Sequence, residues 1–309
     1  MAVVTTTHEL LTLGDNSHGQ LGLGDLRART TPQRVATQVL QVRVCVCVCA
    51  CVRVCAYRST YTQQVDAGHS HTLFMTLNGS LFSSGSNSCG QLGQPPERSI
   101  VMDPELVQTV SGAVCLFACG DHHSVVVTDA NVRAVQAFGS NDHGQLGIGA
   151  RCPAVFEASA VDLEDQRPLA VAAGRYHSLF VGHRGAVYAC GRNASGQLGL
   201  ESRESVSKPV RVRLIDELLR GDQGSDSVRA VSCGAFHSLA LTRRGKVISW
   251  GANTFGQLGI GLVGSEGNCD SKGAGGGSWY EPSFVEIDVW RQPLDEVCVK
   301  CVGCVCMCV

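Results

Sequence analysis

The sequence contains little charge and no basic segment. Only 17% of its 309 residues are charged, the formal net charge is −2, and Lys and Arg do not gather in a tail or cluster. Proteins that attach to nucleic acid by electrostatics present such a cluster to the phosphates. We therefore predict no nucleic-acid partner.

Signals that direct a chain to or across a membrane are missing as well. The sequence has no apolar run of about 18 residues, the length that spans a bilayer. Its first residues lack the charged and apolar regions of a signal peptide. Of the 17 cysteines, seven are scattered and ten lie in two Val/Cys-rich segments. Scattered cysteines are typical of a reducing compartment, so we predict a cytoplasmic and/or nuclear protein with no membrane partner.

No arrangement of residues typical of an enzyme is found. Ser, His and Asp do not occur with the spacing of a known nucleophile set, and no Lys-Ser/Thr follows Gly22-Leu23-Gly24 to make a phosphate loop. Cys298 and Cys301 have the spacing of zinc ligands, but they belong to a tract in which Val and Cys alternate. We predict no catalytic residue, no metal site and no cofactor, and hence no enzymatic activity in this chain itself.

What the sequence does contain is a repeated phrase, Gly-Gln-Leu-Gly. It returns five times at intervals of 52 to 71 residues, beginning at Gly19, Gly90, Gly144, Gly196 and Gly256. Self-similarity at a fixed period indicates one supersecondary unit that is copied along the chain. The phrase, called GQLG below, therefore predicts a repeat architecture.

A second landmark, Gly-x-x-His, precedes four of the five phrases by 22 to 24 residues. These GxxH motifs begin at Gly68, Gly120, Gly174 and Gly234. In the last copy, a strand-like run over 238–242 is followed by a turn at 243–245 and a second strand over 246–250. Another short strand precedes each GxxH, and a Pro-led segment precedes that strand. Four short strands per repeat are typical of a β-propeller blade.

The combined pattern GxxHSLALTxxGxVxxWGxNxxGQLG resembles the RCC1-like repeat of the regulator of chromosome condensation family. The resemblance covers roughly residues 1–289 and implies an all-β, RCC1-type propeller of four-stranded blades around a central channel. Family members have seven blades. This chain starts within a repeat and holds about five of the seven, so we predict an incomplete propeller over residues 1–294.

Two Val/Cys-rich segments do not fit the repeat. They lie at residues 43–57 and 295–309. Alternating Val and Cys is what a (TG)n tract encodes, because GTG is Val and TGT is Cys. The first segment also lengthens the gap between GQLG and GxxH to 46 residues, from Gly22 to Gly68, against 27 to 35 in the other repeats. We interpret 43–57 as an intron-derived insert and 295–309 as an artefactual tail.

The histidines of the four GxxH motifs are predicted to be structural. Identical positions in successive blades are displaced around a propeller and do not converge on one ion. We expect each ring to hydrogen-bond backbone within its own blade. The glutamine and leucine of GQLG are likewise predicted to form a turn bond and to fill the core. The histidines are His71, His123, His177 and His237.

The two variable residues of each GxxH are better candidates for binding. They occupy equivalent turns yet differ in chemistry, so the scaffold does not dictate them. In exchange-factor members of the resembled family, acidic and His residues in these turns contact a small GTPase, and only Asp121-His122 matches that chemistry here. Arg175, Tyr176 and Phe236 are of types enriched at binding hot spots. We predict a partner-binding site made by Asp121, His122, Arg175, Tyr176 and Phe236.

Two classes of function fit these observations. The first is a regulatory protein–protein interaction module that binds a partner on a propeller face. The second is a guanine nucleotide exchange factor that binds the nucleotide-free form of a small GTPase better than the loaded form. A further alternative is that the propeller belongs to a larger ubiquitin ligase or kinase. All three predict a protein partner.

Overall fold

The computed structural model of the chain is built almost entirely of β-strands. It describes residues 2–4, 10–35, 64–76, 78–130, 132–164, 168–220, 226–259, 285–287, 298–301 and 305–308. Within these residues there is one short helix, α1 (Arg213–Leu218). The predicted all-β fold of four-stranded antiparallel sheets is thereby confirmed.

Four successive repeats each form one four-stranded antiparallel sheet whose strands follow one another in chain order. We call these sheets blades B to E. Blade B contains β4 (Val65–Ala67), β5 (His71–Met75), β6 (Leu81–Ser86) and β7 (Ile100–Leu106); blade C contains β8 (Val114–Cys119), β9 (His123–Ala130), β10 (Val132–Asn141) and β11 (Cys152–Val161); blade D contains β12 (Ala170–Ala173), β13 (His177–Val181), β14 (Val187–Gly191) and β15 (Val206–Arg211); and blade E contains β16 (Val228–Cys233), β17 (His237–Thr242), β18 (Val247–Gly251) and β19 (Val285–Ile287).

The first repeat forms blade A, which has three strands: β1 (Ala2–Val4), β2 (Leu10–Gly14) and β3 (Arg29–Arg34). Near the other end, β20 (Cys298–Cys301) and β21 (Val305–Cys308) form a two-stranded sheet. The predicted insert at 43–57 lies outside the described residues, and so does residue 294. The domain boundary predicted at residue 294 therefore stays a prediction.

The four complete blades share one strand register. The GxxH histidine pairs with a glycine at the end of the third strand in every blade: His71 with Gly85, His123 with Gly139, His177 with Gly191 and His237 with Gly251. Gly85 has a φ of 113°, and a Cβ on it would lie 2.4 Å from the carbonyl oxygen of Ser70. Only glycine combines this conformation with so close an approach.

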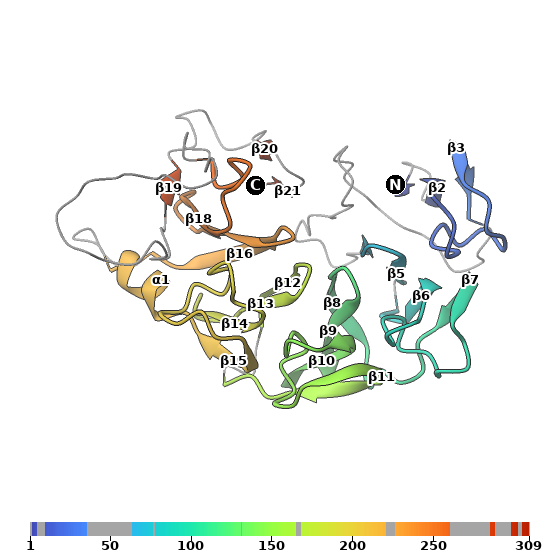
Figure 1. The fold of residues 1–309 in the computed structure, drawn as a ribbon, viewed down its shortest axis with the longest axis horizontal. Helices are drawn as coiled ribbons and strands as arrows, with labels where there is room; N and C mark the ends of the chain where they lie inside the picture. Colours follow the sequence, from blue (N-terminus) through green and yellow to red (C-terminus); the bar gives the residue numbers. More distant parts are fainter. Residues whose placement is uncertain are drawn as a thin grey trace.

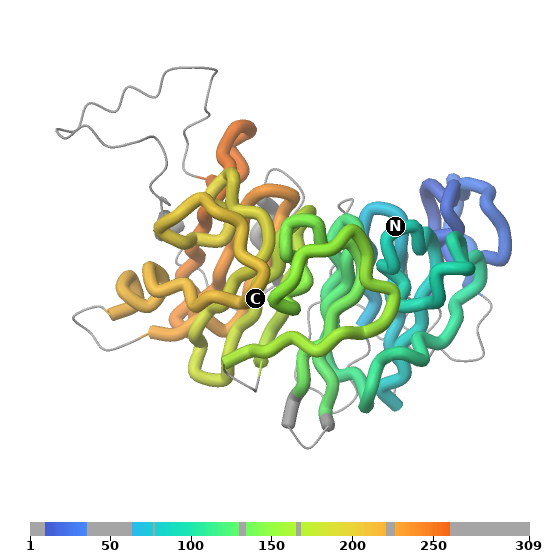
Figure 2. The backbone as a smooth tube through the Cα atoms, turned by 60° about the horizontal axis from the view of Figure 1, so that its bottom comes forward, coloured from blue at the N-terminus to red at the C-terminus, as the bar shows by residue number. Residues whose placement is uncertain are grey.

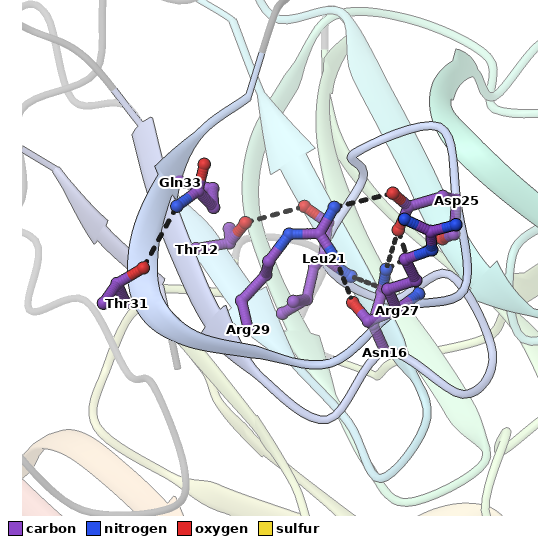
Figure 3. A network of polar contacts seen from close by, with 8 residues as sticks. All are labelled: Thr12, Asn16, Leu21, Asp25, Arg27, Arg29, Thr31 and Gln33. Atoms are coloured by element: carbon purple, nitrogen blue, oxygen red, sulfur yellow. Dashed lines mark hydrogen bonds and ion pairs between the residues drawn. The ribbon is translucent and has the colours of Figure 1, made fainter.

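The GQLG turn is held by a side-chain network that repeats in each blade. In blade A, Asn16 Oδ1 accepts a bond from the Leu21 N–H at 2.9 Å, and Asn16 Nδ2 donates to the Asp25 carbonyl at 2.8 Å (Figure 3). Gln20 Oε1 accepts from the N–H of His18 at 2.9 Å. Leu21 is 3% exposed. The predicted turn bond and core-filling role of Gln and Leu are confirmed.

The hydrophobic core lies between blades rather than within one. One cluster joins Leu73 of blade B to Phe117 and Phe138 of blade C, and equivalent clusters join blade C to blade D and blade D to blade E. Because the sheets stack face to face, each buries the apolar side chains of its neighbour. The blades accordingly follow one another around an arc, from blade A in blue to blade E in orange (Figures 1 and 2).

Candidate functional site

The GxxH turns of successive blades are bonded to one another. The His69 N–H donates to the Asp121 carbonyl at 3.2 Å, the Asp121 N–H to the Gly174 carbonyl at 3.3 Å, and the Arg175 N–H to the Ala235 carbonyl at 3.4 Å. These bonds bring the variable residues of four blades onto one edge. We call that edge the GxxH rim; it comprises His69-Ser70, Asp121-His122, Arg175-Tyr176 and Ala235-Phe236.

Beneath the rim, the motif histidines connect neighbouring blades. His71 Nε2 lies 3.1 Å from Ser124 Oγ in the next blade, and Ser124 Oγ donates to the Gln91 carbonyl at 2.8 Å. The same arrangement links His123 to Ser178 and His177 to Ser238. The predicted structural role is confirmed, but the predicted partner is wrong. In these three cases Nε2 of the ring bonds a hydroxyl of the following blade.

The geometry also sets the tautomer of these rings. A carbonyl oxygen only accepts, so the Ser124 hydroxyl gives its hydrogen to Gln91 and accepts from His71 Nε2–H. The ring is therefore protonated on Nε2, and its low pKa keeps it neutral at pH 7. Burial lowers the pKa of His71 to about 3, and neighbouring histidines add to the effect. Burial likewise lowers the pKa of His123 to about 3. Protonating either ring would place a cation, away from water, in the buried interface between two blades, which we call the seam.

Arg175 and three of the other four predicted site residues lie together, with the Arg175 guanidinium at the centre. Its Nε lies 3.4 Å from Asp121 Oδ2. Its central carbon lies 5.3 Å from the centre of the Tyr176 ring and 5.6 Å from that of Phe236. Three blades contribute to this arrangement: Asp121 from C, Arg175 and Tyr176 from D, and Phe236 from E. Arg175 is thus the centre of the site.

The fifth residue, His122, lies on the other side of Asp121. Its ring is half-buried and stands 5.5 Å from the His69 ring of blade B. Burial lowers the pKa of His122 more than Asp121 raises it, and His69 and Arg175 lower it further. His122 is therefore largely neutral at pH 7 and does not add a cation to the rim. The Asp121-His122 pair consists of one carboxylate and one neutral imidazole.

The structure adds two residues that the sequence analysis missed. His143 stands edge-on to the Tyr176 ring at 5.0 Å between centres, and the Arg192 guanidinium lies 5.6 Å from the same ring. Both belong to the turns that follow the third strand of blades C and D. Tyr176 is thereby enclosed by Arg175, Arg192 and His143 while remaining partly exposed. A cation above the face of an aromatic ring is attracted by the quadrupole of the ring, and this attraction stabilises the arrangement.

The surface around Arg175 consists mainly of arginine and aromatic side chains. Among the described residues, no group of three or more His, Cys, Asp or Glu side chains is placed to hold a metal ion. In the same part of the chain, no helix is long and apolar enough to cross a membrane. The rim offers arginines, aromatic rings and one carboxylate that are accessible from outside. Arginine and aromatic residues are enriched at protein–protein binding sites.

The fold and this site define a β-propeller whose blades are linked by histidine–hydroxyl bonds. Residues 58–308 match the RCC1-like domain, and residues 7–75 match the regulator of chromosome condensation (RCC1) repeat. The chain belongs to the RCC1-like domain family.

Relatives within the family are much longer than this chain. It is 31% identical over 262 residues to the human probable E3 ubiquitin-protein ligase HERC6, covering 83% of this chain and 23% of HERC6. It is 30% identical to the ultraviolet-B receptor UVR8 of Arabidopsis thaliana, covering 84% and 52%, and 33% identical to mouse RCC2, covering 61% and 39%. The chain thus spans less than two thirds of each.

Solved structures have the same fold. Human WBSCR16 superposes with a TM-score of 0.68 at 22% identity, covering 85% of this chain and 62% of that one. Prp20p from Saccharomyces cerevisiae superposes with a TM-score of 0.65 at 21% identity, covering 85% and 58%. The likeness establishes the RCC1-type propeller.

Proposed function

We propose that the GxxH rim binds a protein partner and that the chain acts as an interaction module with no chemistry of its own. The observation that carries the proposal is the arrangement around Arg175. One exposed guanidinium is held by Asp121 of one blade, Tyr176 of its own and Phe236 of the next. A guanidinium oriented in advance loses little side-chain entropy when it binds a partner.

The size of the rim also supports this function. A standard interface buries about 800 Å² on each partner, which exceeds the area of a single turn. Backbone bonds connect the turns of blades B, C, D and E, so several blades present one continuous surface. Asp121 and Arg175 are partly exposed, with 30% and 44% of their side chains accessible. A partner would cover a pre-formed surface and would not need to open the core.

The test is the double substitution Arg175→Ala with Tyr176→Ala. The matched control is Arg27→Ala, which removes an exposed guanidinium from blade A, outside the rim. Proteins retained by wild-type and variant chains from cell extract would be compared by quantitative mass spectrometry. We expect the rim variant to lose specific partners while it stays folded, with a melting temperature lowered by no more than a few degrees, and the control to retain them. Retention of every partner by the folded rim variant would refute the proposal.

A second candidate is exchange-factor activity on a small GTPase. The observation that favours it is Asp121 beside His122, the acidic and imidazole pair that exchange factors of the family place in these turns. Prp20p, which has the same fold, binds Gsp1p and histones. Release of GDP from small GTPases would be measured with wild type and with Asp121→Ala. Faster GDP release with wild type that Asp121→Ala abolishes would favour exchange activity. Partner binding without faster GDP release would favour the interaction module.

The same rim could serve within a longer protein. HERC6 carries the similar region in 23% of its length, and we propose that in such an arrangement the propeller selects the partner. The predicted cytoplasmic and/or nuclear location stays a prediction. Expression of the spliced transcript with a fluorescent tag would test the location, and its sequence would show which segments accompany the propeller.

A further inference from the structure

The face opposite the GxxH rim collects basic side chains from segments that are far apart in the sequence. β13 begins at the rim with His177 and ends at Val181, where the turn 182–185 begins. Five strand residues span roughly 16 Å, so this turn lies at the other end of blade D. β17 places the turn 242–246 of blade E at the same end.

Contacts around Ser227 bring four of these segments together. A Cβ on Gly185 would lie 2.6 Å from Ser227 Cβ, so the blade D turn touches the start of β16. The Arg243 N–H donates to the Ser227 carbonyl at 2.8 Å, which adds the blade E turn. The Asp226 N–H donates to the Leu219 carbonyl at 3.2 Å, which adds the end of α1. Figure 1 shows α1 beside these strands at one end of the arc.

The segments carry seven exposed cations. We call them the basic face: Arg184, Arg213, Arg220, Arg229, Arg243, Arg244 and Lys246. Residues 182–185 and 213–246 also contain four acidic residues, so their net charge is +3. The whole chain is −2, which leaves −5 on the remainder. Asp216, one of the acids, is paired with Arg211 at 2.8 Å. These segments are therefore net positive in a chain that is net negative overall.

The composition of the face indicates what it binds. Six of the seven cations are arginines, whose planar guanidinium binds a carboxylate or phosphate through two parallel bonds. Residues 182–185 and 213–229 contain no Phe, Tyr or Trp on which nucleic-acid bases would stack. Leu218, between the cations of α1, is 53% exposed and offers an apolar contact. One leucine gives little insertion into a bilayer but is sufficient to anchor an apolar side chain of a peptide.

We infer that the basic face binds an acidic segment of a protein, with Leu218 receiving an apolar residue of that segment. The inference is independent of the GxxH rim, because the two surfaces lie at opposite ends of the same strands. Carboxylates would pair with the guanidinium groups of both turns and of α1 at once. Such binding is steered by long-range attraction and weakens as salt screens it.

The test uses the full chain and a fluorescent peptide of glutamates with one central leucine. The variant Arg184→Glu with Arg243→Glu reverses two charges of the face. The matched control, Arg27→Glu with Lys208→Glu, reverses two exposed charges elsewhere. We expect the face variant to weaken binding at least about tenfold and the control less than about twofold. Leu218→Ser should weaken binding of this peptide but not of a glutamate peptide without leucine.

Further probes separate the alternatives. Duplex DNA and vesicles containing phosphatidylserine would be titrated under the same conditions, and the rim variant Arg175→Ala with Tyr176→Ala should bind the peptide as wild type does. The Ala versions of Arg184 and Arg243 give a second reading if the reversal disturbs folding. Tighter, face-dependent binding of DNA or vesicles would overturn the inference, as would equal loss in the control or no peptide binding.

Discussion

His122 and His123 are adjacent in the sequence, yet they belong to two regions that require different properties of a side chain. His123 is fully buried in the seam between blades C and D, where its ring bonds Ser178. His122 lies half-buried on the rim, 5.5 Å from His69. The seam position is occupied by histidine in four repeats, whereas the rim position holds Ser, His, Tyr and Phe. Two adjacent residues at the start of β9 thus contribute to the buried interface between blades and to the exposed rim, respectively.

The difference shows what each region demands of a side chain. In the seam, the ring must donate from Nε2 to a hydroxyl whose own hydrogen is given to a GQLG carbonyl, and only a narrow set of residues can do so. On the rim, Arg175 interacts with three neighbours through an ion pair and two cation–π contacts, which require less exact geometry than a buried hydrogen bond. We expect seam substitutions to affect folding and rim substitutions to affect binding. Four predictions test this separation.

The largest effect should come from acid. His71 and His123 have pKa values of about 3 in the folded chain, against about 6.5 when unfolded. The unfolded state therefore binds more protons between these values, and stability falls as pH drops below 6.5. We expect these two residues to cost roughly 4 kcal/mol together between pH 7.5 and pH 5. The difference between the free energies of unfolding in urea at the two pH values measures this loss.

The variant for this prediction is His123→Gln, which keeps a donor but cannot take up the proton. It should reduce the loss of stability between the two pH values by roughly 2 kcal/mol, the share of one such ring, and His18→Gln, at an exposed turn, serves as the control. An equal pH dependence in His123→Gln and wild type would show that the buried rings are not responsible.

The second prediction concerns the hydroxyl that joins two blades. Ser178→Ala removes the acceptor of His123 Nε2–H and the donor to the Gln145 carbonyl, which lies 2.7 Å from Ser178 Oγ. The Nε2–H of His123 then has no acceptor, and the Gln145 carbonyl keeps only the Cys190 thiol as a donor, at 3.5 Å; together these losses should cost about 2 kcal/mol. Ser178→Thr should cost less, because Thr72 at the equivalent place in blade B donates to the Gln20 carbonyl at 2.9 Å. Equal losses in both variants would point to packing as the cause.

The sequence was sufficient to predict the blades and the rim. GQLG and GxxH each impose a local geometry, namely a turn with glycines at positive φ and a histidine that pairs with a glycine. Such local requirements recur at a fixed period, so they can be recognised from the sequence pattern alone. The rim followed from the same periodicity, because equivalent turns lie at the same end of every blade. The partner of the rim does not follow, since its residues vary freely.

Contacts between blades were less predictable. The bond from His123 to Ser178 joins residues 55 positions apart, and we expected a partner within the blade. A signal was present: a hydroxyl residue follows every motif histidine, as in His71-Thr72 and His123-Ser124. The basic face was hidden for the same reason. Arg184 and Arg243 are separated by 59 residues, and their turns lie on the same face only because both contact Ser227.

The third prediction moves to the rim and should show a smaller effect on stability. Tyr176→Ala removes a ring that contacts Arg175, Arg192, His143 and Phe236. Partly exposed cation–π contacts contribute about 0.5–1 kcal/mol each, and water replaces part of what is lost, so we expect a cost of about 1 kcal/mol. Tyr176→Phe keeps the ring and is the control. Thermal unfolding of both variants would show whether the cost is larger, in which case the rim would belong to the scaffold.

The smallest effect should be the coupling between Asp121 and Arg175. Their closest atoms are 3.4 Å apart, and the side chains are 30% and 44% exposed, so water screens the pair and competes for both groups. Exposed ion pairs contribute about 0–1 kcal/mol. A double-mutant cycle on unfolding free energies, with Asp121→Ala, Arg175→Ala and their combination, should give a coupling below about 0.5 kcal/mol. The same cycle applied to partner binding should give a larger coupling, because a partner that covers the rim excludes the screening water. A strong coupling in the free protein would mean that Arg175 is held for stability, and the separation between seam and rim would not apply at the centre of the proposed site.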